Sequence, residues 1–146
     1  MTGEAEARRR IVAVLLDELG DAGFALAGSG AIREHGLTER PTEGIDLFSC
    51  PSTTADEFQA ALARAGDALR EARYAVMWRR SVPLFARLRA TAPDRTVLDV
   101  DLAVNWRADP PVCLSVGAVL SERDAVAGKL SAVYSRGEVR DFLGAR

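Results

Sequence analysis

The chain has 146 residues, the length of one ordinary domain and enough to bury a hydrophobic core. Hydrophobic residues make up 48% of it and charged residues 27%, a balance that excludes a disordered or fibrous protein. The net charge of −2 excludes a global basic field but not a local basic patch. No apolar run approaches the roughly 18 residues of a membrane span, so we expect a cytoplasmic protein without a membrane partner.

Lysine and cysteine are both rare in the sequence. Lys129 is the single lysine among 19 basic residues, and the two side chains are not interchangeable as charge donors. Cys50 and Cys113 form no CxxC motif or Cys/His cluster, so no zinc site is expected. Both lie in apolar segments, which predicts reduced core residues of a cytosolic protein.

The sequence pattern predicts an α+β fold, in which a mixed, mainly antiparallel sheet is flanked by helices. The expected elements of the first half are a helix over 3–22, a buried strand over 24–27, a tight turn over 28–30, a helix over 31–35, a strand over 45–50 and a helix from Thr54 to about Ala72. Those of the second half are strands over 73–81, 84–91 and 96–105, a helix over 121–135 and a short helix over 138–143. We expect residues 1–146 to form a single domain.

Two features of the first half have the chemistry of a phosphate or cation site. The turn Gly28-Ser29-Gly30 separates a buried strand from a helix, where backbone N–H groups and a hydroxyl can bind phosphate, although such a tripeptide is also an ordinary turn. Asp46 lies in an otherwise apolar strand, where a carboxylate is costly unless it is paired or bound to a cation. The alternative is a strand-end aspartate that reaches solvent or a backbone amide.

The second half adds further carboxylates and the lysine. Asp99 and Asp101 share one face of the clearest strand, and a divalent cation would offset their repulsion. The alternative is the solvent face of an edge strand. Lys129 lies at the margin of the apolar stripe of its helix, where it could equally be a snorkelling lysine. Asp141 follows Arg140 and could form a plain surface ion pair with it.

The order of these features is more specific than any one of them. A strand, a Gly-Ser turn and a helix, followed by carboxylates on two later strands, describes the palm of polymerase-β-type nucleotidyltransferases. The turn would hold a triphosphate, and the carboxylates would hold two Mg²⁺ ions that activate a hydroxyl and neutralise the leaving pyrophosphate.

Two segments about 80 residues apart resemble the AbiEii/AbiGii family of toxin nucleotidyltransferases. The first runs from Leu26 to Leu37 and resumes from Arg40 to Phe48, and the second covers Val119–Leu130 with Tyr134-Ser135-Arg136 and Arg140–Leu143. The resemblance implies a Mg²⁺-dependent transfer of a nucleotide from an NTP to an RNA acceptor such as tRNA. It also implies a role in toxin–antitoxin or phage-defence systems, with a cognate antitoxin as protein partner.

The resemblance also assigns roles to individual residues. Gly28 and Ser29 would bind the nucleotide phosphates, Asp46 and Asp101 would ligate Mg²⁺, Lys129 would reach the phosphates, and Asp141 would orient Lys129.

The sequence departs from the family pattern at several positions. Gly44 stands where the family carries the first acid of an Asp-x-Asp pair, and Glu43 would point to the opposite face of a regular strand. Asn105 stands where close relatives often carry an acid, and we expect the chain to lack the C-terminal helical extension of relatives. Two alternatives therefore remain. One is a catalytically silent nucleotide- or partner-binding homologue, and the other is a small antitoxin nucleotidyltransferase that modifies a partner toxin.

Overall fold

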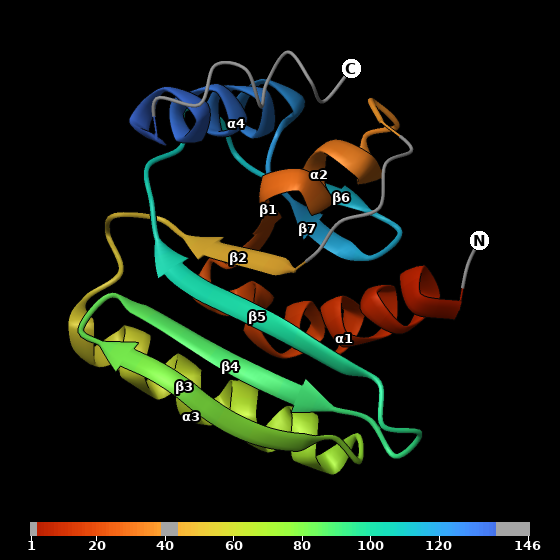
Figure 1. The fold of residues 1–146 in the computed structure, drawn as a ribbon. Helices are drawn as coiled ribbons and strands as arrows, with labels where there is room; N and C mark the ends of the chain where they lie inside the picture. Colours follow the sequence, from red (N-terminus) through yellow and green to blue (C-terminus); the bar gives the residue numbers. More distant parts are fainter. Residues whose placement is uncertain (1–2, 39–43, 137–146) are drawn as a thin grey trace.

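The computed structural model describes residues 3–38 and 44–136, with side chains described as far as residue 130 (Figure 1). In this part of the chain, seven strands form one sheet in the order β3-β4-β5-β2-β1-β7-β6. The strands are β1 (Ala25–Ala27), β2 (Ile45–Ser49), β3 (Ala75–Val82), β4 (Phe85–Thr91), β5 (Val97–Val104), β6 (Val112–Leu114) and β7 (Gly117–Val119). The helices are α1 (Gly3–Leu19), α2 (Gly28–Glu34), α3 (Ala55–Glu71) and α4 (Glu122–Arg136), with a 3₁₀ turn over Gly20–Ala22.

The sheet is mixed and mainly antiparallel, as the sequence predicts. Strands β1 and β7 are parallel, and so are β2 and β5, whereas the other neighbouring pairs are antiparallel. The parallel pairing of β2 with β5 is the arrangement that matters for function, because it brings the strand of Asp46 beside the strand of Asp101.

The hydrophobic core lies between the sheet and helices α1 and α3, which pack against each other on one face of it (Figure 1). Alternate residues of β4 and β5 enter this core and are almost completely buried, namely Ala86, Leu88, Ala90, Leu98, Val100 and Leu102. Because side chains alternate along a strand, the residues between them point to the opposite face. That opposite face carries the arginines of β4 and the aspartates of β5.

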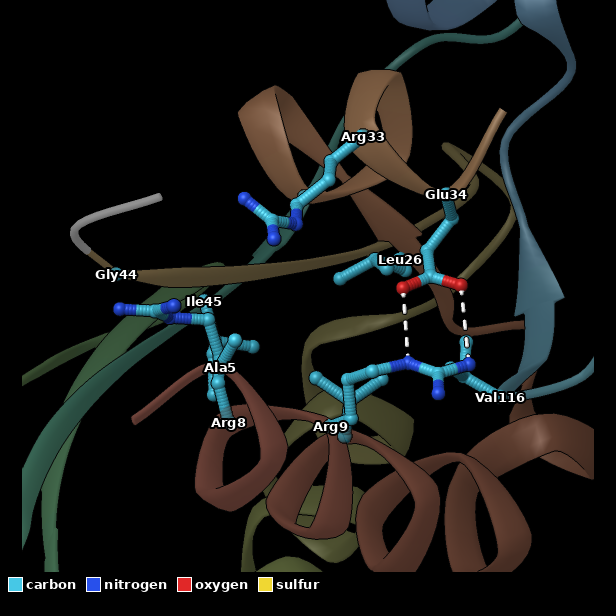
Figure 2. A pocket seen from close by; sticks show the side chains of 11 residues that line it. Ala5, Arg8, Arg9, Leu26, Arg33, Glu34, Gly44, Ile45 and Val116 are labelled. Carbon is cyan, nitrogen blue, oxygen red and sulfur yellow. Dashed lines mark hydrogen bonds and ion pairs between the residues drawn. The ribbon is translucent and has the colours of Figure 1, made fainter. Parts of the chain in front are cut away.

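Helices α2 and α4 pack against each other beside β1 and β7 (Figure 1). Arg9 links α1 to α2, since its Nε donates a hydrogen bond to Oε2 of Glu34 at 3.1 Å (Figure 2). The His35 ring, just after α2, contacts the Leu120 carbonyl through Nε2 at 2.8 Å. These contacts hold the C-terminal end of the short α2 in place.

The caps expected at the starts of α3 and α4 are confirmed, with one difference in α4. Thr54 begins α3 with a capping box, in which its hydroxyl accepts from the Glu57 N–H while the Glu57 carboxylate accepts from the Thr54 N–H. Ser121 accepts from the Asp124 N–H at 3.1 Å in the same way. The Asp124 carboxylate instead accepts from the N–H groups of Ala108 and Asp109, so it fixes the loop after β5 to the start of α4.

Several sequence-based predictions need correction. Cys50 and Cys113 are free, as expected, but neither is a core residue, because Cys50 is half-buried and Cys113 is exposed on the edge strand β6. The hairpin of β6 and β7 was not predicted. Strand β5 lies between β4 and β2, so the edge-strand explanation of Asp99 and Asp101 is wrong.

Strand β3 forms the other edge of the sheet, and its pairing with β4 is shifted between Trp78 and Arg80, the mark of a β-bulge. None of the described helices has the length and apolar character needed to cross a membrane. The helix expected over 138–143 lies outside the described residues.

Candidate functional site

The Gly28 turn differs from the expected tight turn, because β1 runs directly into α2. Gly28 is itself the first helical residue and has a φ of +62°, a conformation that glycine adopts at little cost. Ser29 follows in the first turn of the helix and is half-buried. The N–H groups that begin α2 therefore follow immediately after the end of β1.

The Gly28 backbone lies directly against the Asp46 side chain. Asp46 is the register partner of Ala27 in the antiparallel pair of β1 and β2. A Cβ atom built on Gly28 would lie 2.3 Å from Oδ2 of Asp46, closer than any real contact. The turn and the carboxylate therefore share one corner of the sheet, as their order in the sequence predicts.

Asp101 lies beside Asp46 on the neighbouring parallel strand, where the two residues are register partners. Register partners on adjacent strands point to the same face of a sheet, so both carboxylates are directed away from α1 and α3. Burial, and then the negative charge of Asp101, raise the pKa of Asp46 from 3.8 to about 6, while Arg87 acts in the opposite sense. A bound cation would offset both effects that disfavour the charged form of Asp46, namely its burial and its repulsion from Asp101.

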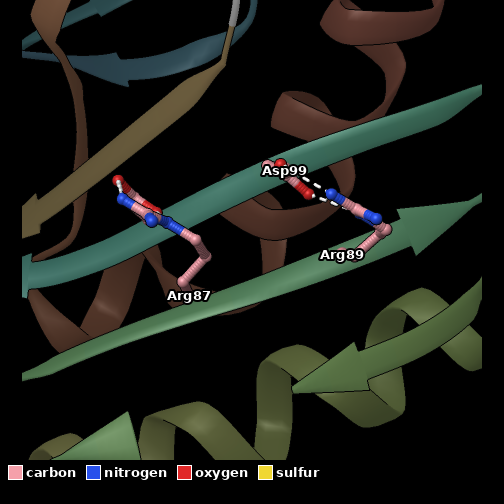
Figure 3. A network of polar contacts seen from close by, with 4 residues as sticks. Arg87, Arg89 and Asp99 are labelled. Carbon is pink, nitrogen blue, oxygen red and sulfur yellow. Dashed lines mark hydrogen bonds and ion pairs between the residues drawn. The ribbon is translucent and has the colours of Figure 1, made fainter. Parts of the chain in front are cut away.

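Two arginines of β4 face the aspartates of β5 (Figure 3). Arg87 donates from Nε and Nη2 to the two oxygens of Asp101 at 2.6 and 3.0 Å. Arg89 likewise donates from Nε and Nη2 to the two oxygens of Asp99, at 2.9 and 3.3 Å. These hydrogen bonds hold the pKa of Asp99 below its usual value. Asp99 therefore lies beside the site with its charge paired. The ion pair with Arg89 accounts for a carboxylate at this position, so no cation is needed to explain it.

Neither arginine was found from the sequence. The signal available was the alternation of Phe85, Arg87 and Arg89 with small and apolar residues, which places all three on one strand face. Their partners depend on the register between β4 and β5, which the alternation does not specify.

Mg²⁺ is often held by one or two carboxylates together with waters and substrate phosphates, and Asp46 with Asp101 fits that donor set. The described residues contain no group of three or more His, Cys, Asp or Glu side chains that could hold a metal ion by themselves. Arg87 already engages both oxygens of Asp101, so a cation would compete with it. The arrangement suits one ion completed by a triphosphate better than two ions held by protein.

Gly44 precedes Asp46 by two residues, and the structure leaves space for a Cβ atom there. A Cβ atom at this position would meet only the Asp99 carbonyl oxygen, at 3.6 Å, which is an ordinary contact. Its φ is outside the positive range that favours glycine. The backbone conformation therefore does not require glycine at position 44.

The remaining candidate residues lie in or after α4. Lys129 is half-buried on α4, which packs against α2, the helix that contains Ser29. Asp141 lies outside the described residues, so its expected role in orienting Lys129 stays a prediction.

A basic and aromatic cluster lies on the same sheet face, toward the β3 edge. Arg80 is the register partner of Arg87, and both guanidinium groups lie over the Phe85 ring, 5.9 and 5.8 Å from its centroid. Arg79 and Arg80 are exposed. Exposed arginines around an aromatic ring are the combination that binds the backbone and bases of single-stranded nucleic acid.

Comparison with known proteins finds solved structures with a similar fold. No protein-family model and no curated protein sequence matches the chain. JHP933 from Helicobacter pylori matches with a TM-score of 0.60 at 15% identity, over 88% of this chain and 56% of that one. The nucleotidyltransferase toxin MenT4 (Rv2826c) from Mycobacterium tuberculosis H37Rv matches with a TM-score of 0.59 at 17% identity, over 88% and 53%.

The chain therefore spans little more than half the length of these structures. At such low identity the likeness shows the fold alone, which is the level at which the resemblance to toxin nucleotidyltransferases is confirmed. The chain has the mixed α+β fold of MenT4, which is a nucleotidyltransferase toxin.

Proposed function

We propose that the protein is a Mg²⁺-dependent nucleotidyltransferase that transfers a nucleotide from an NTP to an RNA acceptor such as tRNA. The observation that carries the proposal is the corner at which the Gly28 backbone, Asp46 and Asp101 meet on one sheet face. A toxin among the structural neighbours supports a toxin-like role in a toxin–antitoxin or phage-defence system, with an antitoxin protein as partner.

Each residue has a defined task in this proposal. The N–H groups at Gly28 and the Ser29 hydroxyl bind the NTP phosphates, and Lys129 supplies a positive charge to them. Asp46 and Asp101 hold the cation, and Asp141 orients Lys129. When bound, Mg²⁺ would neutralise charge on the phosphates and favour deprotonation of the attacking hydroxyl. The raised pKa of Asp46, about 6, means that cation binding at this carboxylate would displace a proton at and below that pH.

The acceptor is proposed to lie across the exposed face of β3 and β4. The cluster of Arg80, Phe85 and Arg87 extends from the Asp101 side of the site toward the sheet edge, and Arg79 adds a further charge. Arg87 belongs to this cluster and also pairs with Asp101. Binding of an RNA phosphate by Arg87 would therefore release Asp101 for the cation. The net charge of −2 does not exclude RNA binding at this face, because the RNA backbone is attracted by the positive charge of the local cluster.

Two features of the site favour slow transfer. Gly44 supplies no oxygen at a position on the same face as Asp46, and Arg87 competes for Asp101. They also favour the second candidate function, which is a catalytically silent homologue that binds nucleotide without transferring it.

One experiment separates these two functions. The protein is incubated with each labelled NTP, Mg²⁺ and total RNA, and label in RNA is measured beside nucleotide binding. Asp46→Asn is the test variant, and Asp99→Asn is its matched control on the same sheet face. Transfer that is lost in Asp46→Asn and retained in Asp99→Asn supports the enzyme, whereas binding without transfer supports the silent homologue. Failure to bind any NTP would contradict both.

A further inference from the structure

The Phe85 ring borders the candidate site on the open face of the sheet. Phe85 precedes Arg87 by two residues on β4, so both side chains lie on the face that carries Asp101. The residue between them, Ala86, is completely buried in the core on the other face. Phe85 is half-buried, and its register partner on β5 is Ala103, whose side chain is small. The ring is therefore accessible to a flat ligand from the side of the site.

The position of the ring relative to Asp101 corresponds to the size of one nucleotide. Asp101 is the register partner of Arg87, and a separation of two residues along a strand is roughly 7 Å. The Arg87 guanidinium connects the two, since it donates to the Asp101 carboxylate and lies 5.8 Å from the centre of the Phe85 ring. A base stacked on Phe85 would therefore leave the ribose of the same nucleotide within reach of the Asp101 carboxylate.

The ring lies on the opposite side of the carboxylates from the phosphate site proposed at Gly28. Register pairing across β4, β5, β2 and β1 gives the row Arg87, Asp101, Asp46 and Ala27. Gly28 follows directly after the last residue of this row, whereas the aromatic ring stands beside the first. NTP phosphates at the Gly28 end and an acceptor hydroxyl at the Asp101 end would meet at the carboxylates. The ring is thus placed for a base of the acceptor.

The two guanidinium groups over the ring do not prevent a base from binding there. Arg80 and Arg87 are both exposed, and exposed cation–π contacts contribute little to stability. Stacking of a base on an aromatic ring changes affinity more than such a contact does. The displaced guanidinium groups can then bind RNA phosphates with charge-assisted hydrogen bonds. RNA binding would therefore exchange two weak contacts for a base stack and stronger polar contacts.

We propose that the base of the acceptor's last nucleotide stacks on Phe85. The inference rests on the proposed function, because it takes RNA as the acceptor, and it adds the residue that positions the end of that RNA. The base must be free of its own helix to lie on the ring, so the acceptor ends in a single strand. Because every base has a face that can stack, the ring selects an unpaired end and not a particular base.

The test combines removal of single bases from an RNA with variants of the protein, and it needs no transfer. A 5′-labelled single-stranded RNA oligonucleotide is compared with three forms that keep every phosphate. Each form lacks one base, that of the last, the second-last or the third-last nucleotide. Affinities are measured by fluorescence anisotropy without NTP.

Phe85→Leu is the test variant, because it keeps an apolar side chain and removes the aromatic face. Phe85→Trp restores an aromatic ring at the same position. Trp106→Leu is the matched control, since Trp106 is an aromatic residue that is 69% exposed and lies beyond the end of β5. The control separates stacking on Phe85 from stacking on an exposed aromatic side chain elsewhere.

We expect removal of the last base to weaken binding to the natural protein by at least roughly fivefold, and removal of either inner base to weaken it less. In Phe85→Leu, the intact RNA and the RNA without its last base should bind equally, whereas Phe85→Trp and Trp106→Leu should keep the difference. Equal sensitivity to the last base in Phe85→Leu and in the natural protein would overturn the proposal. Loss of that sensitivity in Trp106→Leu would overturn it too.

The natural protein alone decides the outcome if Phe85→Leu does not fold. Equal losses of affinity for all three shortened bases would then overturn the proposal, and so would a failure of the natural protein to bind the intact RNA. A loss confined to the last nucleotide would support it.

Binding of a labelled NTP to the same variants identifies whose base lies on the ring. Phe85→Leu should leave NTP affinity unchanged, and weaker NTP binding would assign the ring to the base of the NTP and overturn the proposal. Label transfer to RNA without a specific effect of the last base would leave the proposed function standing and remove the role of Phe85. Stacking of the last base on Phe85 without transfer would support the role of Phe85 in a silent homologue, so the two proposals fail separately.

Discussion

Gly28 and Asp46 are in such close contact that neither position can be changed without regard to the other. A side chain on Gly28 would collide with Oδ2 of Asp46, and the φ of +62° adds backbone strain for any residue with a Cβ atom. The turn that we propose to bind phosphate and the carboxylate that we propose to bind the cation are thus one packed unit.

Gly28→Ala is expected to destabilise the fold by about 2 to 4 kcal/mol, because the strain of positive φ adds to the collision with Asp46. Gly36→Ala is the control for strain alone, since Gly36 has a φ of +76° and open space around it. Urea unfolding of Gly28→Ala, Asp46→Ala and the double variant measures the coupling. A double variant as unstable as the sum of the two single variants would contradict the contact.

Gly44→Asp is expected to fold normally, because a Cβ atom at this position meets only the Asp99 carbonyl oxygen, at an ordinary distance. It adds a carboxylate on the face of Asp46, so Mg²⁺ affinity should rise by roughly tenfold and transfer should become faster. Calorimetric titration with Mg²⁺ measures the affinity, and Gly44→Asn is the uncharged control. Unchanged affinity in Gly44→Asp would show that position 44 is not a ligand position.

Arg87→Gln is expected to raise Mg²⁺ affinity by roughly fivefold, because it frees Asp101 from an exposed ion pair of about 1 kcal/mol. The same variant should bind RNA more weakly. Arg89→Gln is the matched control, since it breaks an equivalent fork to Asp99 on the same two strands. If both variants change Mg²⁺ affinity equally, the effect is one of general charge and the specific role of Arg87 is wrong.

Stability without metal is expected to fall as the pH rises through the pKa of Asp46. The pKa in the folded protein, about 6, lies above the ordinary value of 3.8, so the folded state binds this proton more tightly than the unfolded state does. The stabilisation is present below about pH 4 and is lost by about pH 7, with a magnitude of at most about 3 kcal/mol. Urea unfolding in EDTA across this range measures it, and Asp46→Asn should remove that part of the pH dependence.

Lys129→Ala is expected to weaken NTP binding by more than about tenfold while changing the melting temperature little, since a half-exposed lysine contributes little to the core. Fluorescence titration with a labelled NTP measures the affinity. Unchanged affinity would return Lys129 to the role of a snorkelling lysine at the edge of its helix.

The fold class could be predicted from the periodicity of the strands and helices. The corner of Gly28, Asp46 and Asp101 could be predicted from the order of the motifs along the chain. Arg87 could not, because it acts through a partner, Asp101, that only the folded chain brings close. Cys113 was misplaced for a related reason. Its segment is apolar, but it forms a three-residue strand at a sheet edge, where apolar side chains remain exposed.

The bulge between Trp78 and Arg80 has a consequence for association between copies of the chain. An edge strand exposes unpaired backbone groups, and β3 also exposes Met77 and Val82, 57% and 41% accessible, which makes it a template for intermolecular strand pairing. The bulge interrupts the regular row of backbone donors and acceptors, and two adjacent arginines stand at that point. Replacing them with threonine would leave an edge of high β-propensity and low charge, on which aggregation during refolding is expected to begin.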